Sequence, residues 1–174
     1  MAFITDFPYH KDIRSFTLPA GARQEVRQKA KFKGRIQLRI SSTGPVIFQI
    51  TGPHVEQTEF QGTREVSFNV DPGTEFFIAF QNKSGFFVKP VSITVEVTMY
   101  GSKKAFEALE KVKNVTSLLR DTPDFYPLQR EAVKEILKEA AEVWGHLDEE
   151  GKSVVRELIM LTKKLEGELE KTVS

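Results

Sequence analysis

The stretch that decides the fold is residues 91–112, VSITVEVTMYGSKKAFEALEKV, in which the spacing of apolar residues changes. Up to Met99 apolar and polar residues alternate, which is the period of a half-buried β-strand. From Phe106 onward apolar residues recur every three or four positions, which is the period of an amphipathic helix. The sequence therefore predicts an α+β chain in two parts, with a β domain over residues 1–101 and a helical domain over residues 102–174.

The same alternation extends back through the first half of the chain. Between Ile13 and Tyr100, about eight strand-like runs are separated by turn sequences such as Thr43-Gly44-Pro45 and Asp71-Pro72-Gly73. No helical pattern of useful length interrupts these runs, so the crossover helices of a parallel sheet are not expected. The pattern predicts an antiparallel β-sandwich of the jelly-roll type.

Phenylalanine is abundant, with 14 residues in the chain. Bulky aromatic side chains in a small sandwich are usually buried. We expect the sandwich core to contain the four that lie in phase with aliphatic neighbours, which are Phe48, Phe68, Phe76 and Phe80. Phe86 and Phe87 follow a turn sequence, and we expect them to pack as well; the alternative is an exposed contact surface.

Residues 76–97, FFIAFQNKSGFFVKPVSITVEV, resemble the end of a GOLD (Golgi dynamics) domain. In that family an aromatic-rich strand ends in Phe-x-Asn-x-Ser and leads through a short turn to a lysine and a long β-branched strand. The matching residues here are Phe80, Asn82, Ser84 and Lys89. Residues 45–50 resemble an earlier core strand of the family, and Asp71-Pro72-Gly73 lies where its aromatic hairpin begins.

The resemblance covers about residues 13–100 and implies a β-sandwich module that binds proteins without catalysis. GOLD domains often act in membrane traffic and beside lipid-binding domains. This chain departs from the family pattern, because it lacks the usual cysteine pair, secretion signal and membrane anchor. A cargo-receptor role is therefore not expected. Asn82 and Ser84 are expected to make turn hydrogen bonds rather than to bind a ligand.

A cluster of cations lies in residues 23–39, where Glu25 is the one acid. Alternation predicts a hairpin that turns at Lys33-Gly34-Arg35, with the cations on its solvent face and Lys29 opposite Arg39. Like charges in that position repel each other, so we expect some compensation.

The cluster has two interpretations. One is a site for an anionic partner, such as an acidic or phosphorylated protein or a lipid headgroup, formed by Arg27, Lys29, Lys31 and Arg39. The other, which the pattern favours, is a solvated strand face balanced by acids such as Glu65 or Glu96 on neighbouring strands. Nucleic acid is not an expected partner, because this face interleaves no aromatic residues for base stacking.

The second half predicts a bundle of three helices, over about residues 102–119, 127–144 and 148–171. Ser102 suits the N-cap of the first helix, and Gly145 ends the second. The two later helices each carry one apolar stripe, which favours packing within an intramolecular bundle. The alternative is an assembly face for self-association or docking, formed by Val154, Leu158, Leu161 and Leu165.

Residues that usually carry catalysis are scattered. The chain has no cysteine, which excludes disulfides, thiol catalysis and thiolate metal sites. His10, His54 and His146 show no metal-ligand spacing, and no phosphate-binding glycine loop appears. We therefore expect no catalytic residues, no metal and no cofactor.

These observations favour a non-catalytic interaction or scaffold module, whose sandwich binds a protein partner and whose helices mediate docking or self-association. Peripheral contact with anionic lipid is a further expectation, and no apolar stretch is long enough to cross a membrane. The absence of cysteine and of an N-terminal secretion signal predicts a cytoplasmic location. The alternative function is a coat or virion building block, and an unrecognised enzyme ranks third.

Overall fold

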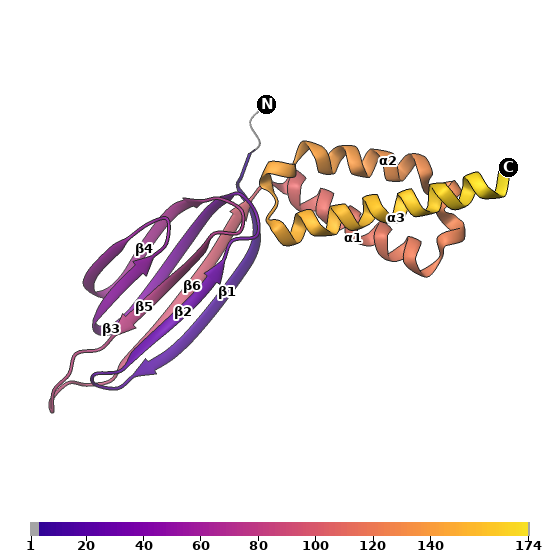
Figure 1. The fold of residues 1–174 in the computed structure, drawn as a ribbon. Helices are drawn as coiled ribbons and strands as arrows, with labels where there is room; N and C mark the ends of the chain where they lie inside the picture. Colours follow the sequence, from indigo (N-terminus) through magenta and orange to yellow (C-terminus); the bar gives the residue numbers. More distant parts are fainter. Residues whose placement is uncertain (1–3, 174) are drawn as a thin grey trace.

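The computed structural model describes residues 4–173; residues 1–3 and 174, which belong to the two predicted domains, lie outside the described residues. The fold is α+β, with six antiparallel strands in one curled sheet followed by three α-helices (Figure 1). The strands are β1 (Phe7–Leu18), β2 (Arg23–Lys29), β3 (Gly34–Thr51), β4 (Glu56–Val70), β5 (Glu75–Gln81) and β6 (Val91–Gly101). The helices are α1 (Lys103–Asp121), α2 (Tyr126–Glu142) and α3 (Glu149–Val173), with short 3-10 turns at Pro123–Phe125 and Trp144–His146.

The sheet has six strands rather than the predicted number of about eight, because β3 and β4 are long and bent. β3 runs through the predicted turn at residues 43–45, and its register against β4 shifts between Ser42 and Val46. Gly62 of β4 lies opposite Ser42 and has a φ of 89°, which a residue with a Cβ rarely adopts. Both strands therefore bend at this place. Residues 43–45, which were predicted to form a turn, instead curve β3 without ending it.

The bend allows β3 to change partners along its length. Residues 34–42 lie between β4 and β6, whereas residues 47–51 pair with β5. The resulting strand order is β1-β6-β3-β5-β2, with β4 paired to β3. β1 and β2 come together at the open side of the curl, where Gln28 Nε2 donates a hydrogen bond of 2.9 Å to Asp12 Oδ2.

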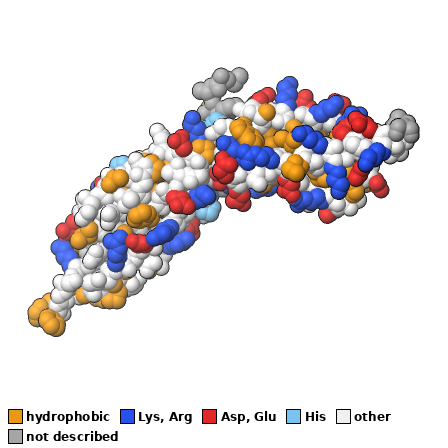
Figure 2. All heavy atoms as spheres, viewed as in Figure 1, with side chains coloured by type: hydrophobic (Ala, Val, Ile, Leu, Met, Phe, Trp, Pro, Cys, Tyr) orange, Lys and Arg blue, Asp and Glu red, His pale blue; other side chains and the backbone are white. Residues whose placement is uncertain are grey.

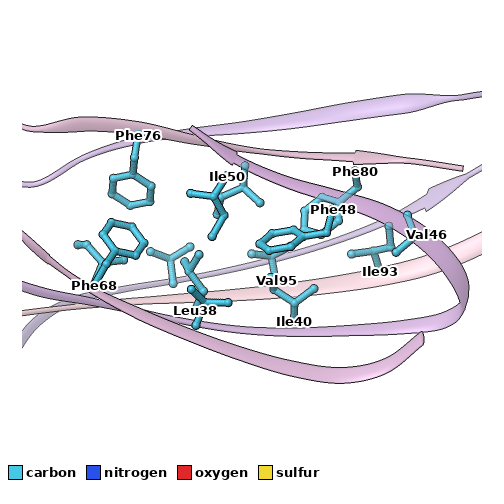
Figure 3. Close-up of a cluster of buried hydrophobic side chains, with 14 of the residues drawn as sticks. Leu38, Ile40, Val46, Phe48, Ile50, Phe68, Phe76, Phe80, Ile93 and Val95 are labelled. Carbon is cyan, nitrogen blue, oxygen red and sulfur yellow. The ribbon is translucent and has the colours of Figure 1, made fainter. Parts of the chain in front are cut away.

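A core of aliphatic and aromatic side chains fills the curl (Figure 3). The four phenylalanines predicted for it are all buried, which confirms that prediction. The rings of Phe48 and Phe80 lie 5.5 Å apart, and those of Phe68 and Phe76 meet edge to face at 5.3 Å. Each fully buried phenylalanine stabilises the fold by roughly 1.5–3 kcal/mol, so these contacts hold the two halves of the curl together.

The three predicted helices are present and share a second core. Ser102 caps α1 as predicted, because its Oγ accepts a hydrogen bond from the backbone N–H of Ala105. α1 packs against both α2 and α3. In the described part of the chain, no helix combines the length and the apolar character needed to cross a membrane.

The apolar stripe of α3 faces the other helices. Leu158 and Leu165 are buried, while Val154 and Leu161 are half-buried against the same core. These four residues belong to the intramolecular bundle, so the structure does not offer them as a free assembly face. The reason is that α2 and α3 carry complementary stripes that cover each other and α1.

Phe32 connects the sheet to the helices. It lies between β2 and β3 but belongs to the helical core, where its ring is 4.9 Å from that of Tyr9 and 6.1 Å from that of Phe106. The backbone N–H of Lys33 also donates to the carbonyl oxygen of His146 at 3.1 Å. The helices therefore attach at one end of the sheet and leave the opposite end free (Figure 1).

Candidate functional site at the free end of the sheet

The structure separates Arg39 from the other three cations of the predicted anion site, whereas Arg27 and Lys29 line one hollow and Lys29 and Lys31 line another. β2 pairs with β5, and β3 pairs with β4 and β6, so the predicted hairpin between residues 23 and 39 is wrong. Lys29 lies opposite Glu75 rather than opposite Arg39. The physical reason is that Phe32 packs in the helical core. The segment between β2 and β3 therefore leads away from β2 instead of forming a tight turn that would pair the two strands.

Three of these cations have an acid beside them. Arg39 lies opposite both Glu65 and Glu96, and its Nε is 3.9 Å from Glu65 Oε1, as the balanced-face interpretation predicted. Arg27 has a guanidinium nitrogen 3.7 Å from Glu25 Oε2. Lys29 lies opposite Glu75 of the neighbouring strand β5. Such pairing reduces the attraction of this face for an anionic partner.

Lys31 lines a cavity of about 390 Å³ between the sheet and the helices. Burial lowers the pKa of Lys31. The hydroxyl of Tyr9 accepts a hydrogen bond of 3.2 Å from the backbone N–H of Lys31. Tyr9 therefore helps to connect the sheet to the helices. Lys29, Asp148 and Glu150 also line the cavity, so its charges offset one another. We assign this cavity a structural role.

The most unusual surface is the loop of residues 82–90 between β5 and β6. Phe86 is 102% exposed and Phe87 is 98% exposed, so the expectation that they pack is wrong and both rings are exposed, as in the alternative. Figure 2 shows a hydrophobic cap at the extreme end of the molecule, opposite the helices. Leaving two phenylalanines in water forgoes roughly 3–6 kcal/mol of burial energy, which identifies the loop as a candidate contact site.

Asn82 fixes the base of this loop. Its side-chain amide is buried and donates hydrogen bonds of 3.0 Å to the carbonyl oxygens of Leu18 and Lys89. Its Oδ1 accepts a hydrogen bond of 2.8 Å from the backbone N–H of Lys83. These contacts join both ends of the loop to the end of β1, and they confirm that Asn82 serves turn hydrogen bonding.

The apex of the loop is a tight turn. Val88 N–H approaches the carbonyl oxygen of Gly85 at 3.4 Å, which places Phe86 and Phe87 at the two central positions of the turn. Gly85 has a φ of 140°, and a Cβ there would be strained. In such a turn neither central side chain points back toward the sheet, so both rings project outward.

Two lysines are the charged residues of the loop. Lys83 Nζ is 2.7 Å from Glu59 Oε1 on β4. Lys89 is exposed and, among residues 4–173, forms no ion pair. The loop therefore presents two aromatic rings beside a cation whose charge is available to a partner.

Groups that could support catalysis are not gathered at this end. Within residues 4–173, no cluster of three or more His, Asp or Glu side chains is arranged to hold a metal ion. The loop of residues 82–90 contains no acid and no histidine.

No protein-family model matches this chain, and no curated protein matches its sequence. Similar solved structures include the g-type lysozyme inhibitor PliG of Aeromonas hydrophila, 13% identical, over 52% of this chain and 86% of that one, with a TM-score of 0.37. The Yersinia pseudotuberculosis-derived mitogen is 9% identical over 56% of this chain and 91% of that one, with a TM-score of 0.42. A de novo designed double-stranded β-helix is 17% identical over 49% of this chain and 97% of its own, with a TM-score of 0.36. At these scores the similarities carry no argument about function.

Sequence reasoning missed the loop, although one signal was present. Adjacent residues of a strand point to opposite faces, so Phe86 and Phe87 cannot both face one core. They also lie between Gly85 and Pro90, which favour a turn over a continued strand. The general tendency of phenylalanine to be buried outweighed this local signal.

Proposed function

We propose that this protein is a non-catalytic interaction module that contacts its partner through Phe86 and Phe87. The single observation that carries the proposal is the near-complete exposure of both rings on a loop whose base is fixed by Asn82. Adjacent exposed aromatic residues are energetically unfavourable in an isolated protein, and they are enriched at the centres of binding sites.

The sheet supports this role by acting as a rigid spacer. In this proposal the two halves of the sheet form a jelly-roll-like sandwich. Kinship with GOLD domains, also part of the proposal, would account for the hydrogen bonds that Asn82 makes at the base of the loop. The aromatic loop lies at one end of the spacer and the helices lie at the other (Figure 1). In a scaffold of this kind the helical end is available for docking or self-association while the loop is engaged. A cytoplasmic location remains a prediction from composition.

The loop has an advantage over the basic residues as a contact site. Acids lie beside Arg27, Lys29 and Arg39, so a partner would compete with those acids. Phe86 and Phe87 are almost fully exposed, so a partner would displace only water from them. Binding at the loop therefore gains apolar burial without breaking an internal interaction.

Site-specific photo-crosslinking tests this function. The full chain would carry benzoylphenylalanine in place of Phe87 and would be irradiated in cells of the source organism, with products separated into protein and lipid fractions. Leu128 of α2, which is 80% exposed, provides the matched control position. A discrete product from position 87 that position 128 does not give, and that Phe86→Ser abolishes, would support the proposal. Equal labelling at both positions would refute it.

A further inference from the structure

We propose that the partner of this loop is the interfacial region of a lipid bilayer that carries anionic headgroups. This inference rests on the proposed contact role of Phe86 and Phe87 and names the surface that they enter. It is argued from three features of the free end of the sheet: its shape, its charge and its backbone.

The shape of this end suits a flat surface. The loop of residues 82–90 forms the extreme tip of the molecule, beyond the ends of the strands (Figure 1). Both rings lie at the apex and nothing surrounds them, so they can reach a plane before any other part of the chain contacts it (Figure 2). Phenylalanine is among the apolar residues that peripheral proteins insert at the boundary between headgroups and acyl chains.

The three segments that form this end contain cations but no acid of their own. Three segments meet there: residues 19–22 through the bond from Gly21 N–H to Lys83 O, residues 43–45 through the bond from Ser92 N–H to Thr43 Oγ1, and the loop itself. Together they contain Lys83 and Lys89 but no carboxylate, although the whole chain has 24 acids. The nearest acid identified by contact is Glu59, which pairs with Lys83.

The opposite end has the opposite bias. Residues 102–174 carry 13 Lys/Arg and 15 Asp/Glu, whereas residues 1–101 carry 12 and 9. An anionic membrane would therefore attract the tip and repel the helices, and the molecule would stand with its helices away from the bilayer. A protein pocket would need only the rings, whereas the exposed Lys89 beside them and the lack of acids in these three segments suit an extended negative surface.

The backbone of the loop also suits the hydrated headgroup region of a bilayer. In the turn from Gly85 to Val88, one backbone hydrogen bond is formed, so the other polar groups need water or headgroups as partners. This geometry limits entry to the headgroup boundary, because unpaired backbone groups are costly in hydrocarbon. We therefore expect shallow, reversible insertion of the two rings, with Lys89 at the headgroup level.

Vesicle co-sedimentation of the purified full chain tests this inference. The probes are vesicles of phosphatidylcholine alone and of phosphatidylcholine mixed with phosphatidylserine. We expect binding to the mixed vesicles that falls by more than about tenfold in the double variant Phe86→Ser/Phe87→Ser and several-fold in Lys89→Glu. The matched controls, Leu128→Ser on α2 and Lys163→Glu on α3, are both exposed and should bind like the wild type.

Fluorescence quenching reports on depth in the same samples. The natural chain has one tryptophan, Trp144, which lies in the 3-10 turn where the helices meet the sheet, at the opposite end of the sheet from the loop. Vesicles with brominated acyl chains should quench the added emission of Phe87→Trp and leave the emission of the wild type unchanged. Quenching of the wild type to the same extent would place the wrong end in the membrane and would overturn the inference.

Other outcomes separate this inference from the proposed function. If the wild type fails to bind either vesicle, or binds both equally, the proposal of an anionic bilayer is overturned. If position 87 nevertheless crosslinks to a discrete protein, the contact role of the loop stands and its partner is that protein. If neither vesicles nor crosslinks report on position 87, both proposals fail together.

Discussion

The side-chain amide of Asn82 donates a hydrogen bond of 3.0 Å to the carbonyl oxygen of Leu18, a residue 64 positions earlier in the chain. This bond ties the aromatic loop to the last residue of β1 and makes the loop part of the fold at its base. The orientation of Phe86 and Phe87 thus depends on a polar residue that lies outside the apolar core.

Replacing Asn82 tests that anchor. Asn82→Ala removes three hydrogen bonds and leaves the buried carbonyl of Leu18 and the carbonyl of Lys89 with fewer partners, so we expect a loss of about 1–3 kcal/mol in the free energy of unfolding. Urea denaturation measures the change. Asn69→Ala, at an exposed position on β4, is the control and should change the free energy of unfolding by less than about 0.5 kcal/mol. Equal effects of the two substitutions would contradict the anchoring role.

The joint between sheet and helices depends on Phe32. Phe32→Ala would leave a cavity between the rings of Tyr9 and Phe106, with an expected cost of about 3–5 kcal/mol. Urea unfolding followed by Trp144 fluorescence should show the helical transition at lower urea than in the wild type. An unchanged Trp144 transition would show that the helices do not rely on this contact.

Tyr126 gives a prediction that depends on pH. Burial and the hydrogen bond that it donates to Glu166 at 2.7 Å raise the pKa of Tyr126 to about 12. The unfolded value is about 10, so the contribution of the protonated hydroxyl to stability is complete below pH 10 and is lost as pH rises toward 12. Absorbance titration of the tyrosines should show a high-pH step that Tyr126→Phe removes. An identical titration end point in the variant would contradict the assignment.

The inward orientation of the α3 stripe can be tested by paired substitutions. Leu158 is fully buried and Met160 is 71% exposed on the same helix. Leu158→Ala should cost about 2–5 kcal/mol in the free energy of unfolding, whereas Met160→Ala should change it by less than about 0.5 kcal/mol. Light scattering should give the same molar mass for Leu158→Ala as for the wild type. A lower mass together with unchanged stability would restore the assembly interpretation of this stripe.

Local periodicity predicted the elements of this fold better than their pairing. The change of period at Gly101 located the boundary between β6 and α1 to within two residues of its position. The partner of β2 could not be predicted, because its pairing with β5 depends on where Phe32 packs, and that contact involves residues far away in the sequence. Gly34 was predicted to form a turn, yet it allows close approach of β3 to β6, where a Cβ would lie 1.8 Å from Tyr100 O.

The candidate site shows a similar limit. The sequence predicted a break in the strand after Gln81 and hydrogen bonding by Asn82, and both are present, although the turn itself lies at residues 85–88 rather than 82–85. It did not predict that the loop stands beyond the end of the sheet, because that depends on where β1, β5 and β6 end relative to one another. Exposure of Phe86 and Phe87 thus depends on the assembled sheet as well as on the local turn residues.

The most direct test of the central claim is urea denaturation of Phe86→Ser/Phe87→Ser beside Phe48→Ala. If the two rings are held out of the core for contact with a partner, the double variant should unfold with the wild-type free energy to within about 0.5 kcal/mol. Phe48→Ala should lose about 3–5 kcal/mol, because that ring is fully buried. A loss of more than about 2 kcal/mol in the double variant would show that the rings stabilise the fold, and it would contradict a surface reserved for binding.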